Sequence, residues 1–141
     1  MIVGIIGLGA MGLGIAQVYA QAGHQVLATD AQAVSRASAV SRLAAALEPR
    51  VSKGALSAEA RDLLLSRVVV VDTIAALAPA MLVIEAVVEK LSVKQAVFAE
   101  LEPHLSPEAV LATNTSSLSV TEIATALARP GQLLGLHFFN P

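Results

Sequence analysis

The chain of 141 residues contains no cysteine and no tryptophan, and only 14% of its residues are charged. The absence of cysteine excludes disulfides and thiolate metal sites and agrees with a reducing compartment, so we take the cytoplasm as the default location and expect no metal site. A formal charge of −2 with scattered Lys and Arg offers no basic patch for nucleic acid or an anionic membrane. We therefore expect neither as a partner.

Hydrophobic residues make up 55% of the chain, which excludes intrinsic disorder and predicts one domain with a large core. The first charged residue is Asp30, so the preceding apolar stretch has to be tested as a signal peptide or a membrane span. It has no basic start, and several glycines interrupt it. A buried strand, a glycine turn and a buried helix explain this stretch better.

Short apolar runs alternate with helical patterns along the chain. Strands are predicted over residues 1–6, 25–29, 68–71, 81–88, 109–113 and 132–136. Helices are predicted over residues 11–22, closed by Gly23, and over 34–51 and 57–66, with capping boxes at 92–95 and 119–122 starting two more. This alternation predicts a Rossmann-type α/β fold over residues 1–141, a doubly wound, mainly parallel sheet with helices on both faces.

A glycine-rich turn, Gly7-Leu8-Gly9-Ala10-Met11-Gly12, leaves the first predicted strand and opens the first predicted helix. In this context the first glycine permits the turn, the second lets the backbone approach a pyrophosphate, and the third lets the helix pack on the sheet. Asp30 ends the second strand, where its carboxylate can accept hydrogen bonds from a ribose and repel a 2′-phosphate. The pattern favours NAD over NADP; FAD, or a turn without a ligand, remains open on the motif alone.

Polar residues follow three of the predicted strands, in the stretches 85–90, 114–117 and 137–141. The carboxyl ends of parallel strands share one edge, so Asn114, Ser116, His137 and Asn140 are expected beside the glycine turn. His137 is a candidate general base, although a packed histidine is an equal alternative. The hydroxyls around Ser116 could instead satisfy backbone groups of a turn.

Four segments together carry a family resemblance: GLGAMGLGIAQVYAQAGHQV, EAVVEKLSVKQAVFAELE, ATNTSSLSVTEIA and GLHFFNP. In their order and spacing, the chain resembles the NAD-binding domain of the 3-hydroxyacyl-CoA dehydrogenases, including 3-hydroxybutyryl-CoA dehydrogenases, over residues 2–141. The resemblance implies oxidation of an L-3-hydroxyacyl-CoA to the 3-ketoacyl-CoA, with hydride transfer to NAD, as in fatty-acid β-oxidation.

The resemblance also implies roles for single residues. His137 matches the catalytic general base, Ser116 the serine that hydrogen-bonds the substrate oxygen, and Asn140 an asparagine of the same pocket. Glu89 and Lys94 match cofactor contacts. The resemblance further places Asn114 at the nicotinamide end and Lys53 at the CoA phosphates, although Lys53 read alone is an ordinary solvated lysine.

Two features depart from the family pattern. Pro49 stands where many bacterial members have a basic residue before Lys53, with Arg50 next to it, so the CoA contacts match the family less fully than the cofactor site does. The family's helical C-terminal domain, with the glutamate partner of the histidine and the homodimer surface, lies beyond Pro141. We expect this piece to bind NAD and to turn over poorly or not at all.

Three alternatives are kept. A related hydroxy-acid or carnitine-type dehydrogenase shares the cofactor domain but not the thioester. A non-catalytic NAD-binding module is disfavoured by Ser116, His137 and Asn140, which a module for sensing does not need. A segment of a multifunctional fatty-acid oxidation protein is disfavoured by Met1 directly before the first strand.

Overall fold

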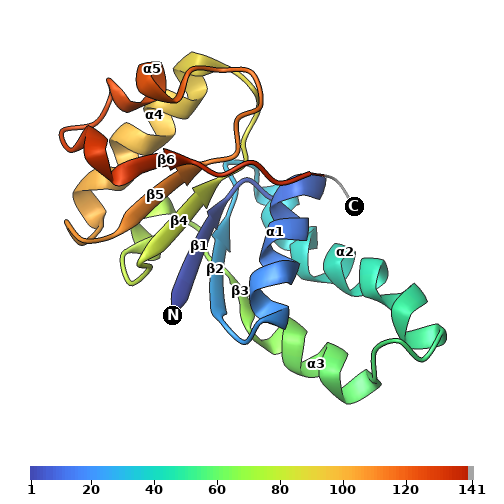
Figure 1. Ribbon diagram of the computed structural model, residues 1–141. Coiled ribbons are helices and arrows are strands. Elements are labelled where there is room, and N and C mark those ends of the chain that lie inside the picture. Colours follow the sequence, from blue (N-terminus) through green and yellow to red (C-terminus); the bar gives the residue numbers. More distant parts are fainter. Residues whose placement is uncertain (140–141) are drawn as a thin grey trace.

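The computed structural model describes residues 1–139 and shows a sheet with helices on both faces (Figure 1). The strands are β1 (Ile2–Ile6), β2 (Gln25–Thr29), β3 (Val68–Val70), β4 (Leu82–Glu85), β5 (Val110–Thr113) and β6 (Leu133–Gly135). The helices are α1 (Ala10–Gln21), α2 (Ala33–Ser52), α3 (Ala58–Ser66), α4 (Leu91–Leu101) and α5 (Val120–Ala124). Three short 3-10 turns, η1 (Ile74–Leu77), η2 (Glu102–His104) and η3 (Pro130–Gln132), complete the order.

The six strands are all parallel, in the order β3-β2-β1-β4-β5-β6. The order reverses between β1 and β4, and this is where open parallel sheets bind their ligands. The register places Ile6 beside Thr29 and Glu85, and Glu85 beside Thr113. The ends of four strands therefore form one row at the carboxyl edge. The Rossmann-type fold is confirmed.

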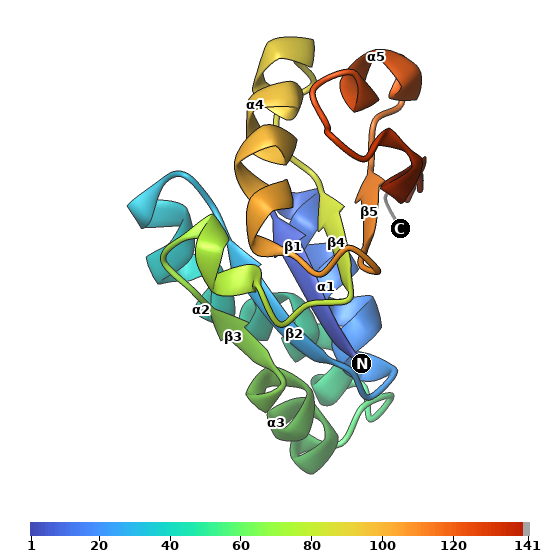
Figure 2. The ribbon, with the colours of Figure 1, turned by 90° about the vertical axis from the view of Figure 1, so that its left-hand side faces the viewer.

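Alternating side chains of the central strands build two cores, one on each face of the sheet. Val3 and Ile5 of β1 pack with residues of α1, α2 and α3, whereas Ile6 packs with residues of α4 and α5. In β4, Ile84 belongs to the same core as Val3 and Ile5, and Val83 belongs to the same core as Ile6. Figure 2 shows α4 and α5 together at one end of the molecule and α3 beside β3 at the other. Burial on both faces explains the continuous apolar runs of these strands.

Two predicted boundaries are wrong. The fourth strand ends at Glu85 rather than at Val88, because the Glu85 carboxylate accepts the amide of Val87 at 2.7 Å and turns the chain away. The capping box at 92–95 does not start a helix, since α4 begins at Leu91 after Lys90. The box at 119–122 is confirmed on its serine side, because the Ser119 hydroxyl caps the amide of Glu122 at 3.2 Å.

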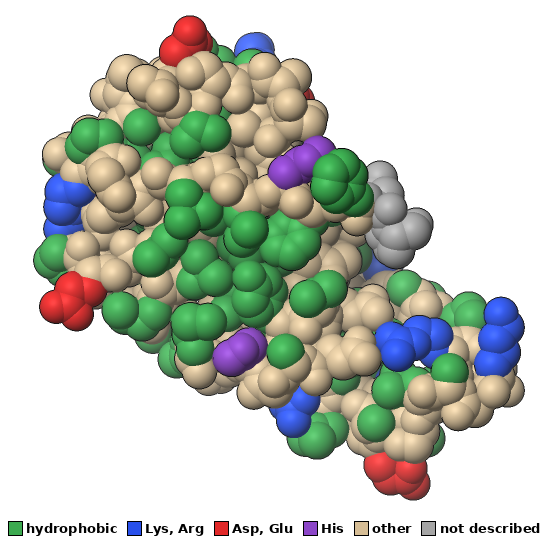
Figure 3. Space-filling model, viewed as in Figure 1, with side chains coloured by type: hydrophobic (Ala, Val, Ile, Leu, Met, Phe, Trp, Pro, Cys, Tyr) green, Lys and Arg blue, Asp and Glu red, His purple; other side chains and the backbone are tan. Residues whose placement is uncertain are grey.

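One face of the sheet has no helix in front of β4–β6 in the view of Figure 1, within residues 1–139. Hydrophobic side chains gather over this region in the space-filling view (Figure 3). Exposed apolar residues in or next to these strands include Met81, Val110 and Leu134. None of the helices in residues 1–139 is long and apolar enough to cross a membrane.

Candidate functional site

The glycine turn connects the end of β1 to the start of α1. Gly7 has φ +104°, and a Cβ there would lie 2.4 Å from the carbonyl oxygen of Ala86. A Cβ on Gly12 would lie 1.7 Å from the carbonyl oxygen of Gly7, whereas one on Gly9 would meet nothing within 4 Å. The first and third glycines are therefore required by the packing of the chain itself. The second leaves open space beside the backbone, as a bound dinucleotide requires.

The amino end of α1 points its backbone donors toward this space. Leu13 donates its amide to the carbonyl oxygen of Gly9 at 3.0 Å, which makes it the first amide bonded within the helix. The amides of residues 10–12 precede it and have no acceptor inside the helix. With the positive end of the helix dipole, they fit the pyrophosphate of NAD.

The remaining residues of the turn contribute in different ways. Leu8 is 0% exposed, and its amide and its carbonyl oxygen are bonded to Asp30 and to Arg42. Ala10 and Met11 line a second, smaller cavity of about 210 Å³ together with Phe138 and Phe139. The turn predicted to bind the cofactor thus also contacts the segment that follows β6.

Asp30 follows β2 and joins the turn to the second strand. Its Oδ2 accepts the backbone amide of Leu8 at 2.8 Å, and its Oδ1 accepts the amide of Gln32 at 2.8 Å. Each carboxylate oxygen retains a second lone pair. The carboxylate can therefore hold the turn in place and still accept hydrogen bonds from ribose hydroxyls.

A cleft of about 600 Å³ lies between the glycine turn and the chain that follows β4. This volume is within the range of about 300–1,000 Å³ that small-molecule sites occupy. Gly7, Gly9 and Asp30 line one side, and Ala86–Val88 line the other. The residues at the switch point of the sheet therefore fit the cofactor that the glycine motif predicts.

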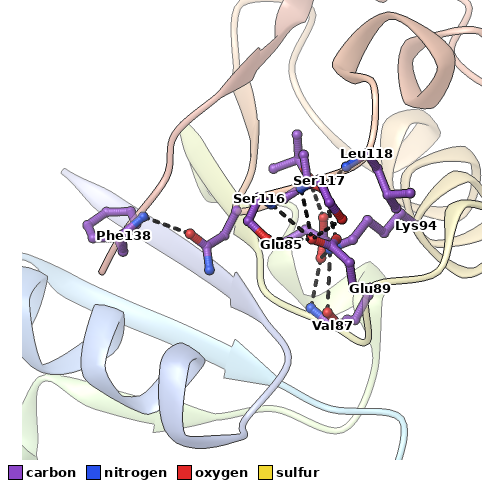
Figure 4. A network of polar contacts seen from close by, with 11 residues as sticks. Glu85, Val87, Glu89, Lys94, Ser116, Ser117, Leu118 and Phe138 are labelled. Carbon is purple, nitrogen blue, oxygen red and sulfur yellow. Dashed lines mark hydrogen bonds and ion pairs between the residues drawn. The ribbon is translucent and has the colours of Figure 1, made fainter. Parts of the chain in front are cut away.

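Glu89 lies just beyond this cleft and gathers the residues that follow β5 (Figure 4). Its Oε1 accepts the hydroxyl of Thr115 at 2.8 Å. Its Oε2 accepts the amide of Ser116 at 2.9 Å and the hydroxyl of Ser116 at 3.0 Å, with longer contacts to Ser117. The Nζ of Lys94 lies 3.4 Å from Oε1. Two predicted cofactor contacts and the predicted substrate serine therefore meet in one cluster.

The pKa of Glu89 is lowered from 4.5 to about 2. Desolvation by burial raises it, but the hydrogen bonds from Ser116 and Thr115 and the charge of Lys94 outweigh that effect. At neutral pH the group is a carboxylate, which can only accept hydrogen bonds. The Ser116 hydroxyl must therefore donate its proton to Glu89 in this structure.

Glu85, at the end of β4, is completely buried, and its carboxylate has three donors. Oε1 accepts the Thr113 hydroxyl at 2.6 Å, and Oε2 accepts the Val87 amide at 2.7 Å and the Lys94 ammonium at 2.5 Å. Lys94 is itself buried, with 2% of its side chain exposed. The two opposite charges compensate each other in a place where either alone would be costly.

Asn114 anchors the segment that carries His137. Its side-chain oxygen Oδ1 accepts the amide of Phe138 at 2.8 Å (Figure 4). The His137 side chain is exposed, and its ring centroid lies 4.5 Å from that of Phe139. The predicted histidine is thus held at the carboxyl edge of the sheet with its ring open to solvent.

One of the predicted substrate contacts, Lys53, is not part of this cluster. Lys53 is exposed at the carboxyl end of α2 and lines neither cavity. Figure 1 shows that the connection from α2 to α3 projects away from the sheet. Asn140 lies outside the described residues.

Sequence reasoning missed the residues that support the site from behind. Arg42 on α2 donates from Nη1 to the carbonyl oxygen of Leu8 at 2.8 Å and also bonds Ser38 and the Ser35 carbonyl. No local pattern marks this residue. Glu85 carried a visible signal, because it is a charged residue inside an apolar run.

Known proteins resemble this chain along almost its whole length. Residues 2–141 match the family described as 3-hydroxyacyl-CoA dehydrogenase, NAD binding domain. A 3-hydroxyadipyl-CoA dehydrogenase of Escherichia coli K12 is 48% identical over 139 residues, which are 99% of this chain and 29% of the relative. A 3-hydroxybutyryl-CoA dehydrogenase of Bradyrhizobium diazoefficiens is 44% identical over 139 residues, which are 99% of this chain and 47% of the relative.

A solved structure shows the same likeness in three dimensions. The crystal structure of a 3-hydroxybutyryl-CoA dehydrogenase from Escherichia coli K12 superposes with a TM-score of 0.95 at 48% identity. The match covers 100% of this chain and 30% of that one. The chain therefore spans less than half the length of these relatives.

Proposed function

Because this chain belongs to the 3-hydroxyacyl-CoA dehydrogenase family, as its NAD-binding domain, we propose that the whole protein oxidises an L-3-hydroxyacyl-CoA to the 3-ketoacyl-CoA. The observation that carries this proposal is the position of residues 86–89. Residues 86–88 line the dinucleotide cleft, and Glu89 directly after them holds Ser116. One short segment therefore joins the cofactor site to the serine proposed to contact the substrate.

NAD, when bound, supplies the acceptor for the hydride that leaves the hydroxyl-bearing carbon. His137 is proposed as the general base, which takes the hydroxyl proton on a ring nitrogen and returns it in the reverse direction. Its exposed ring is open to a substrate. Asn114 supports this role because its side-chain oxygen accepts the amide of Phe138, the residue that follows His137.

Ser116 is proposed to donate a hydrogen bond to the substrate oxygen. In this structure its hydroxyl proton is directed to Glu89, so it has to turn away before it can donate elsewhere. Ribose hydroxyls at the same carboxylate would provide Glu89 with replacement donors. Cofactor binding would then release Ser116 for the substrate, which predicts that NAD binds first.

The substrate side of the site extends beyond the described cluster. Lys53 is proposed to meet the CoA phosphates, and its exposed position leaves the ammonium free for this contact. Asn140 is proposed to line the pocket of His137 and Ser116. The two relatives are named for different acyl groups, hydroxyadipyl and hydroxybutyryl, so the proposed substrate is the class of 3-hydroxyacyl-CoA thioesters.

The test is an assay of the complete protein that carries this domain, with acetoacetyl-CoA and NADH. His137→Gln should lower kcat by about 10²–10⁴-fold, the usual contribution of a general base, with NADH affinity changed by less than about twofold. His24→Gln is the matched control, since His24 lies in the turn before β2. An unchanged kcat in His137→Gln would remove the proposed base. The 141-residue chain should bind NADH but turn over far more slowly.

A further inference from the structure

Glu85 is the buried end of a chain of charges that reaches the edge of the site. Its carboxylate bonds Lys94 at 2.5 Å, the Lys94 Nζ lies 3.4 Å from Glu89, and Glu89 accepts both the amide and the hydroxyl of Ser116. Figure 4 shows these side chains as one network of polar contacts. Each link joins residues on different elements, from β4 through α4 to the segment after β5.

The two carboxylates differ in their access to a ligand. Glu85 is 0% exposed and its known donors are all internal, whereas 36% of the Glu89 side chain is exposed beside the cleft. Lys94 contacts both carboxylates. A buried ammonium between a fixed anion and an exposed anion is held in place by the fixed one.

We propose that Glu85 is a positioning residue for the nicotinamide end of the cofactor. Its charge holds the Lys94 ammonium back from Glu89, and its bond to the Val87 amide shapes residues 86–89. Glu89 thereby stays bonded to Ser116 and remains available to ribose hydroxyls. The proposal rests on the proposed function, because it assigns a role within the same NAD site.

Glu85→Gln removes the charge and keeps the shape. The amide oxygen can still accept from Val87 and Lys94, and the amide nitrogen can donate to the Thr113 hydroxyl oxygen. Without the buried anion, the Lys94 ammonium should move toward Glu89 and weaken the bonds from Glu89 to Ser116. A purely structural role for Glu85 would lower stability without this local effect.

The experiment is calorimetric titration of the chain, Glu85→Gln, Lys94→Met and the double variant with NADH and with ADP, which lacks the nicotinamide half. Glu85→Gln should weaken NADH binding by about tenfold, which is comparable with the loss of one hydrogen bond. ADP affinity should change by less than about twofold. In the Lys94→Met background the substitution should have no further effect, because Glu85 acts through Lys94.

A readout without the cofactor comes from backbone NMR. The amide resonance of Ser116 should move in Glu85→Gln, because its bond to Glu89 weakens, while the amide of Glu122, capped by Ser119, should stay in place. Glu102→Gln is the control for loss of a buried carboxylate, since Glu102 bonds the amides of Ala128 and Arg129. It should leave NADH binding and the Ser116 amide unchanged.

Equal NADH affinity in the chain and Glu85→Gln, or a parallel loss for ADP, would overturn the proposal. If Glu85→Gln does not fold, Lys94→Met is compared with the double variant. A lower NADH affinity in the double variant would show that Glu85 acts independently of Lys94 and would overturn the proposal. If the unmodified chain binds neither nucleotide, the expectation that this domain binds NADH by itself fails, and the titration no longer tests Glu85. The Ser116 amide then decides alone whether Glu85 positions Glu89.

Discussion

The backbone amide of Leu8 donates a hydrogen bond to the Asp30 carboxylate over 2.8 Å, so the glycine turn and the end of β2 form one unit. The residue expected to recognise the ribose therefore also holds the loop expected to bind the pyrophosphate. This coupling means that a change at Asp30 acts on both halves of the adenosine diphosphate.

Asp30→Ala should weaken NADH binding by about tenfold or more, because a charge-assisted hydrogen bond to the ribose is lost and the turn is loosened. The preference for NADH over NADPH should also fall, since the carboxylate no longer repels a 2′-phosphate. Calorimetric titration with both nucleotides measures this. Asp62→Ala, at an exposed carboxylate on α3, is the control. Retention of the full preference in Asp30→Ala would assign cofactor choice to another residue.

Arg42→Met should lower the free energy of unfolding by about 1–2 kcal/mol, because the Leu8 carbonyl loses its charged donor. NADH affinity should also fall, because only the bond from the Leu8 amide to Asp30 would then hold the turn. Urea denaturation and titration measure the two effects. Arg61→Met, which removes ion pairs to Glu48 and Asp62, should change stability by less than about 0.5 kcal/mol. Equal effects of the two variants would contradict a special role for Arg42.

Gly12→Ala and Gly9→Ala should separate folding from binding. The Cβ of the first variant would lie 1.7 Å from a backbone oxygen, so we expect a loss of stability of about 3 kcal/mol or more. The Cβ of the second meets nothing in the chain, so the protein should fold normally and bind NADH at least about tenfold more weakly. Thermal melting and titration test the pair. Normal binding by Gly9→Ala would place the pyrophosphate elsewhere.

The stability of the chain should depend on pH through Glu89. Its folded pKa is about 2, below the ordinary 4.5, so its contribution is present above about pH 4.5 and is lost as the pH falls toward 2. Glu89→Gln lacks this contribution at every pH. The difference in unfolding free energy between the two proteins should therefore be largest near neutral pH and shrink through that window. Denaturation midpoints at several pH values measure it, and a constant difference would show that Glu89 does not gain its donors on folding.

The strand and helix pattern predicted most elements within a few residues, because buried parallel strands and amphipathic helices leave local periodic signals. The predicted end of the fourth strand at Val88 was wrong for a non-local reason. The chain turns after Glu85, and this turn depends on a carboxylate that Thr113 of the neighbouring strand holds in place. The predicted start of α4 was wrong because Ser92 has the sequence spacing of a capping residue but lies inside the helix.

The sequence alone determined the fold class, the glycine turn and the position of Asp30 at the end of a strand, since each depends on residues close together in the chain. Only the tertiary structure decided which groups bond one another at the site. Glu89 meets Ser116 across 27 residues, Thr113 meets Glu85 across 28, and Arg42 meets Leu8 across 34. No local spacing encodes these pairs, because they form only when the sheet order brings β4 beside β5 and α2 packs behind the glycine turn.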